Sequence, residues 1–183
     1  MGGGVRSQEM RFSVKTGDIP AVASTGVLEP ASGFALKKSA LSPLPDGRFF
    51  RFIGQCKSSG ESYFDYFEQL QLLMVDADFQ TSLLNLESIP NPESYTDLQG
   101  FALAGDRLVL ALYNRADDKT DLYAVGLDGG MLAGPYTVSG SPNFFVCGGK
   151  LKTWKFAYGI DEEASSLQIE TIDFKNPVTV DTI

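Results

Sequence analysis

One sequence pattern occurs three times along this chain: two apolar runs joined by a turn of two small residues. Gly and Asp tolerate the positive φ that tight primed turns require, so such a pair between apolar runs predicts a β-hairpin. A basic residue and then a large apolar residue follow each turn. The chain is therefore expected to fold largely as antiparallel strands. The three turns are Asp46 with Gly47, Gly105 with Asp106, and Gly148 with Gly149.

A second landmark recurs in the same order, an apolar segment that ends in an aspartate and has a leucine six residues earlier. The aspartates are Asp76, Asp128 and Asp173, and we expect each to bond the backbone of its own turn. The segment 66–74 contains good helix formers, but its alignment with the two later segments favours a strand. A fourth short strand is expected near 82–86, 134–138 and 177–180. The repeats then span about 33–90, 91–139 and 140–183.

Three four-stranded antiparallel repeats of this kind resemble the blades of β-propeller proteins. The resemblance rests on the turn and the basic and apolar residues that follow it, covers residues 33–183, and indicates no particular family. It implies sheets stacked face to face, and the run 107–113, apolar on both faces, is expected to lie between two of them. A closed propeller takes about four to eight blades, so three would form a partial ring with two open flanks, closed by oligomerisation. A β-trefoil or a β-sandwich is the alternative.

Residues 1–32 are predicted to be a flexible leader with one strand at 10–15, and residues 33–183 to form a single domain. The net charge of −8 argues against binding to nucleic acids or anionic membranes, because affinity for phosphates depends on clustered Lys and Arg. No apolar run has the ~20 residues that cross a bilayer, and the N-terminus has no apolar signal region. Cys56 and Cys147 form no metal spacing and no disulfide framework, so we expect reduced thiols in a chain made in the cytoplasm.

Histidine is absent from the sequence, which removes Ser-His-Asp and Cys-His catalysis and nearly every zinc site. An enzyme of this composition would have to use carboxylates, Lys, Tyr, Ser or Cys. No catalytic pattern of these residues stands out. We therefore expect a protein that is not an enzyme and that has no cofactor and no metal.

An acidic loop supplies the first candidate ligand or interface residues, Asp117, Asp118 and Asp121. Oxygen-rich loops can hold Ca²⁺, but this one lacks the alternating register and the distal Glu of a calcium loop. A solvated hairpin loop is the simpler interpretation, since charge clusters usually mark exposed faces.

Aromatic side chains supply the second group, Tyr63, Phe64 and Tyr66. Aromatics beside carboxylates can stack on sugar rings or anchor a protein interface. Trp154 and Phe156 are instead expected to fill the space between sheets.

These features favour a non-enzymatic structural or protein-interaction module that self-associates or joins other subunits, for example in a virion or tail-type assembly. A carbohydrate-binding domain that uses the loop aromatics and the acidic loops is the alternative, with a glycan as its partner. A hydrolase with paired carboxylates is the third and least favoured hypothesis, because nothing identifies which carboxylates would pair.

Overall fold

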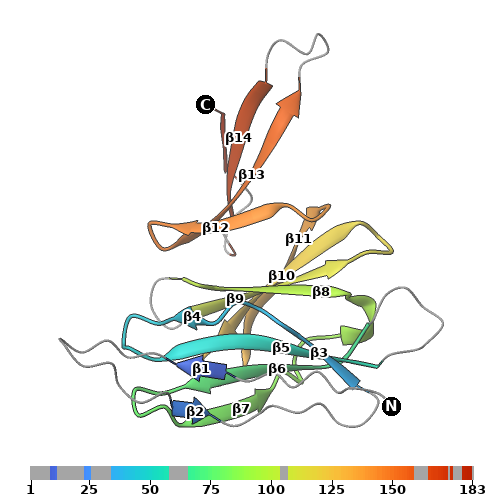
Figure 1. Cartoon of the computed structure of the whole chain (residues 1–183). Coiled ribbons are helices and arrows are strands. Elements are labelled where there is room, and N and C mark those ends of the chain that lie inside the picture. The colour runs from blue at the N-terminus through green and yellow to red at the C-terminus, as the bar shows by residue number, and fades with distance from the viewer. Residues whose placement is uncertain are drawn as a thin grey trace.

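The computed structural model describes residues 9–11, 23–25, 34–57, 66–103, 107–158, 165–172, 174 and 179–182. The fold is all-β, with a strand content of 65% and only antiparallel pairing among the described strands, which confirms the predicted class. The described residues include one short 3₁₀ turn, η1 (Pro92–Ser94), and no helix that could span a membrane. The strands form separate sheets, and none of these sheets closes on itself (Figure 1).

The first large sheet has the order β3-β5-β6-β7, and a short strand, β4, pairs with β5. Its members are β3 (Phe34–Lys38), β4 (Ser42–Pro43), β5 (Phe49–Lys57), β6 (Phe67–Val75) and β7 (Thr81–Asn85). The segment with helix-forming composition is β6, as its alignment with the later segments predicted. Its Leu-rich sequence forms a strand because alternate residues pack against the two opposite faces of the sheet. This tertiary packing overrides the helix propensity of the residues.

The hairpin between β4 and β5 differs from the predicted two-residue turn. The Leu44 amide donates to the Arg48 carbonyl (2.7 Å) and the Gly47 amide to the Leu44 carbonyl (3.1 Å), so three residues lie in the loop. The reason is Pro45, which would flank a two-residue turn at Asp46 and Gly47 but has no N–H to donate to the Arg48 carbonyl. Pro45 instead suits a type I turn, and Gly47, at φ 88°, takes the left-handed position after it. The prediction of a hairpin is confirmed here, and its turn length is wrong by one residue.

The second and third large sheets each run in chain order. The second contains β8 (Asp97–Ala102), β9 (Arg107–Asn114), β10 (Lys119–Gly126) and β11 (Met131–Ser139). The third contains β12 (Asn143–Cys147), β13 (Lys150–Tyr158), β14 (Ser165–Ile172) and β15 (Thr179–Thr182). The turn at Gly148 and Gly149 has two residues with positive φ, 60° and 71°, as predicted. The predicted turn at Gly105 and Asp106 lies outside the described residues, but β8 and β9 on either side of it are paired.

The main hydrophobic core lies between the first and second sheets. Phe50 and Phe52 of β5 meet Leu108 and Leu110 of β9 in this core, and all four are 0% exposed. Successive side chains on a strand point to opposite faces, so β5 and β9 each contribute alternate residues to it.

A smaller core lies between the second and third sheets. It contains Val109 and Leu122 from the second sheet and Leu151 and Ile172 from the third. Every residue from 108 to 112 is therefore buried, with Leu108, Leu110 and Leu112 on one side of β9 and Val109 and Ala111 on the other. The prediction that this run lies between two neighbouring sheets is confirmed.

The two outer faces of the stack differ. On the outer face of the first sheet, Ile53, Leu73 and Val75 are at most 3% exposed. On the outer face of the third sheet, the apolar side chains described on β12, β13 and β14 are half-buried. Figure 1 shows β13 and β14 projecting away from the other two sheets. One flank of the stack is therefore buried and the other is partly open.

A separate two-stranded sheet pairs β1 (Glu9–Arg11) with β2 (Ala23–Thr25). The strand predicted at 10–15 overlaps β1, whereas β2 falls in the part of residues 1–32 where no strand was predicted.

Candidate functional site

The predicted acidic loop is the turn between β9 and β10, and its first aspartates bond local groups. The Asp117 carboxylate accepts from the Asn114 side-chain amide (3.0 Å), and the Asp117 backbone amide donates to the Asn114 side chain (3.1 Å). Lys119 pairs with Asp117 at 3.0 Å, and this contact raises the pKa of the lysine. Asp118, at φ 46°, accepts a hydrogen bond from the Tyr113 hydroxyl (2.9 Å). Both aspartates are exposed and stabilise the turn.

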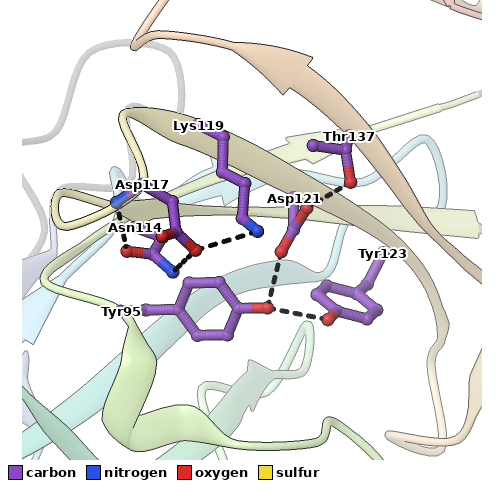
Figure 2. A network of polar contacts seen from close by, with 7 residues as sticks. All are labelled: Tyr95, Asn114, Asp117, Lys119, Asp121, Tyr123 and Thr137. Atoms are coloured by element: carbon purple, nitrogen blue, oxygen red, sulfur yellow. Dashed lines mark hydrogen bonds and ion pairs between the residues drawn. The ribbon is translucent and has the colours of Figure 1, made fainter.

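Asp121, the third predicted residue, lies in a buried network instead of the loop (Figure 2). One of its oxygens accepts from the Tyr95 hydroxyl (2.8 Å) and the other from the Thr137 hydroxyl (2.5 Å). The Tyr123 hydroxyl lies 2.9 Å from that of Tyr95. Tyr95 has one hydroxyl proton and gives it to the carboxylate, so Tyr123 is the donor to Tyr95. These four residues are called the tyrosine–aspartate network.

Tyr95 joins three parts of the fold through this network. It follows η1 in the connection from the first sheet to the second, and its carbonyl accepts from the Phe67 amide of β6 (3.2 Å). Its hydroxyl reaches β10 through Asp121. Burial, followed by the hydrogen bonds to Tyr123 and Asp121, raises the pKa of Tyr95, and burial also raises the pKa of Tyr123. Both rings are at most 4% exposed, so the network is a buried structural link.

The three predicted aspartates therefore do not converge on one site. Two face solvent at a turn, and the carboxylate of the third is occupied by Tyr95 and Thr137. In the part of the chain that the structure describes, no three His, Cys, Asp or Glu residues are grouped to hold a metal ion.

Two of the aspartates at strand ends bond their own turns, as predicted. Asp76 accepts from the backbone amides of Asp78 (3.0 Å) and Gln80 (2.7 Å), and Asp128 accepts from that of Gly130 (3.0 Å). Asp173 lies outside the described residues.

A signal for the tyrosine–aspartate network was present in the sequence. Side chains two residues apart on a strand share a face, so one face of β10 carries Asp121, Tyr123 and Val125. That face is the one packed on the first sheet, so an aspartate there needs buried donors. Tyr95 is 26 residues away in an irregular connection, and no local pattern indicates it.

The predicted aromatic residues are only partly described. Tyr63 and Phe64 lie outside the described residues. Tyr66, directly before β6, is exposed and belongs to neither core. Trp154, expected in a core, is half-buried on the outer face of the third sheet. The side chain of Phe156 is outside the described part.

The outer face of the third sheet has an open apolar hollow of about 430 Å³. Four side chains line it: Phe145 of β12, Trp154 of β13, and Leu167 and Ile169 of β14. The backbone register explains the grouping, because Trp154 pairs with Ile169 and residues directly opposite share a face. We call the face that carries these residues the hollow face. It is a half-exposed apolar surface, and of its four lining residues the sequence analysis had assigned Trp154 to the space between sheets.

Comparison of the chain with protein-family models, with curated proteins and with solved structures found no match.

Proposed function

We propose that this chain is a non-enzymatic interaction module, a partial propeller of three stacked sheets that self-associates through the hollow face. The observation that carries the proposal is the apolar hollow lined by Phe145, Trp154, Leu167 and Ile169 on a half-exposed sheet face. Contiguous apolar surface with aromatic residues at its centre is typical of protein–protein contact sites.

Equivalent strand faces in the three sheets support the inference that another sheet would cover the hollow face. The second and fourth residues after the basic residue that follows each hairpin turn share one face of the strand there. In β5 this face packs on the second sheet, and in β9 it packs on the third. In β13 the same face is the hollow face, where no following sheet is present among the described residues. The residue pairs are Phe50 and Phe52, Val109 and Ala111, and Lys152 and Trp154.

A second copy of this chain is the occupant that the stack supports best. A head-to-tail ring would need an open outer face on the first sheet, but Ile53, Leu73 and Val75 are buried there. One open face can pair only with itself, which gives a closed two-fold dimer. The proposed dimer joins two hollow faces and stacks six large sheets in a row.

The expected affinity is moderate. Burying a large apolar side chain contributes about 1.5–3 kcal/mol, and each protomer offers four such side chains. Association costs about 4–15 kcal/mol in lost translational and rotational freedom, so only part of the free energy gained by burial appears as affinity. A dissociation constant on the order of micromolar is expected.

Sedimentation equilibrium between about 1 and 100 µM, a range around that affinity, tests the proposal. We expect the mass to rise to twice the 19.8 kDa of one chain. Ile169→Lys places a charge in the hollow and should keep the protein monomeric. Leu132→Lys is the matched control, because Leu132 is 54% exposed on β11, away from the hollow face. Circular dichroism shows whether both variants keep the strand content.

Cys147 supplies a second measurement. It is an exposed thiol two residues after Phe145 on β12, so it lies on the same face of the strand, the hollow face. Cys56, by contrast, is buried. Its labelling by a thiol reagent should slow as the protein concentration rises. A monomer throughout the concentration range, or a dimer that survives Ile169→Lys, would refute the two-fold association. A trimer or larger ring would instead require contacts between different faces.

A further inference from the structure

A second hollow lies on the opposite side of the third sheet, in a cleft of about 300 Å³ between the second sheet and β12. Asp97 and Gln99 of β8 and Tyr113 of β9 form one wall. Ser141 and Phe144, on the connection to β12 and on β12 itself, form the other wall. Phe144 and Phe145 point to opposite faces of β12, so this cleft and the hollow face are separate surfaces. We call it the inter-sheet cleft.

Both aromatic rings of the inter-sheet cleft are held by neighbours. The Tyr113 hydroxyl donates to Asp118 (2.9 Å), which fixes the far end of the ring. The Phe144 ring meets that of Phe101 edge to face, with centroids 5.9 Å apart and an interplanar angle of 64°. A ligand that stacks on these rings therefore does not have to order them, and preorganisation of this kind lowers the cost of binding.

The polar side chains of the cleft are available to a ligand. Those of Gln99 and Ser141 are exposed, and neither makes a hydrogen bond within the part of the chain that the structure describes. The Asp97 carboxylate pairs with Lys37 at 3.2 Å, but its side chain is 62% exposed and keeps accepting capacity. The cleft thus combines an amide, a hydroxyl and a carboxylate with two fixed aromatic rings.

We propose that the inter-sheet cleft binds a neutral saccharide. A sugar ring presents hydroxyl groups at its rim, for Gln99, Ser141 and Asp97, and C–H groups on its faces, for Tyr113 and Phe144. The volume of about 300 Å³ is at the lower end of the range for small-molecule sites, which suits one or two sugar units. Asp97 and the net charge of −8 disfavour anionic sugars. This site differs from the loop aromatics and acidic loop suggested by the sequence, although Asp118 takes part by holding Tyr113.

Ligand-detected and protein-detected NMR titrations test the proposal with glucose, galactose, mannose and N-acetylglucosamine, and with sialic acid as the anionic comparison. We expect at least one neutral sugar to bind with a dissociation constant of about 1–10 mM, as suits a small ligand in a shallow site. Tyr113→Ala should weaken binding about tenfold by removing the stacking surface. Gln99→Ala, at an exposed position, should weaken it without changing thermal stability.

Tyr66→Ala is the matched control, because it removes an exposed tyrosine that is not part of the cleft. Sugar affinity unchanged in this variant and reduced in Tyr113→Ala and Gln99→Ala supports the assignment. The proposal fails if no neutral sugar causes saturable shifts up to about 50 mM, several times the expected dissociation constant. It also fails if sialic acid binds best, or if Tyr66→Ala weakens binding as much as Tyr113→Ala. None of these results depends on the oligomeric state.

Discussion

The tyrosine–aspartate network makes a sharp prediction for Tyr95→Phe. The substitution removes one hydroxyl and leaves the ring, so it opens no cavity of any size in the core. It deletes the donor to one oxygen of Asp121 and the acceptor of the Tyr123 hydroxyl. Asp121 is 7% exposed and Tyr123 is 1% exposed, so water has little access to replace either partner.

The magnitude follows from what remains unpaired. A buried polar group that loses its partner costs about 1–3 kcal/mol, and more when the group is charged. Thr137 still donates to the other oxygen of Asp121, so the carboxylate is not left without any donor. We therefore expect Tyr95→Phe to lower the free energy of unfolding by about 2–3 kcal/mol. That is a large part of the ~5–15 kcal/mol by which a domain is usually stable.

Urea unfolding followed by circular dichroism measures this difference, provided that the dependence on urea is the same for both proteins. Tyr113→Phe is the matched control, since it makes the same chemical change at a partly exposed tyrosine whose partner, Asp118, is exposed. It should cost less than about 0.5 kcal/mol, as water replaces the lost bond. The same loss of stability in both variants would refute the view that burial gives the network its importance.

Three further predictions follow from packing and ionisation. The pKa values of Tyr95 and Tyr123 are raised above about 10, the usual value for a tyrosine in an unfolded chain. The stability that these two hydroxyls contribute is therefore fully present below about pH 10 and is lost as the pH rises above it. Alkaline unfolding checks this, because the tyrosinate absorbance of these two residues should appear only when the protein unfolds. Leu110→Ala, at a 0% exposed position, should lower the free energy of unfolding in urea by about 2–5 kcal/mol. Leu132→Ala, at an exposed position, should change this free energy by less than about 0.5 kcal/mol. Gly54→Ala should lower the melting temperature, because the added Cβ would overlap the Phe67 ring; an unchanged melting temperature would contradict this packing.

The hairpins show how far turn chemistry can be predicted from the sequence. At Gly148 and Gly149 both residues adopt positive φ, and the two-residue turn is as predicted. At Asp46 and Gly47 the dipeptide is equally favourable, but Pro45 before it shifts the turn to three loop residues. The general rule indicates where a hairpin forms, and the neighbouring residue decides its geometry.

The candidate site was less predictable, because its partners are distant in sequence. The acidic cluster at 117–121 looks uniform along the chain, yet the strand period separates the turn residues Asp117 and Asp118 from Asp121. Which face of β10 is buried depends on the first sheet, and the donor, Tyr95, lies in the connection between sheets. The apolar pattern of β13 and β14 likewise does not show whether a sheet covers the hollow face, since only tertiary packing decides this.

The composition of the hollow face argues for a reversible contact rather than a permanent one. Phe50 and Val109, which occupy equivalent positions after their turns, are 0% exposed between sheets, but the third sheet has Lys152 there. A lysine at such a position lowers the apolar area available for association and makes an unpaired sheet face less prone to aggregate. Trp154, two residues on, has the large ring that a contact centre needs. A face with both features can remain in water as a monomer and still bind a second copy, so the dimer should dissociate on dilution into the low micromolar range.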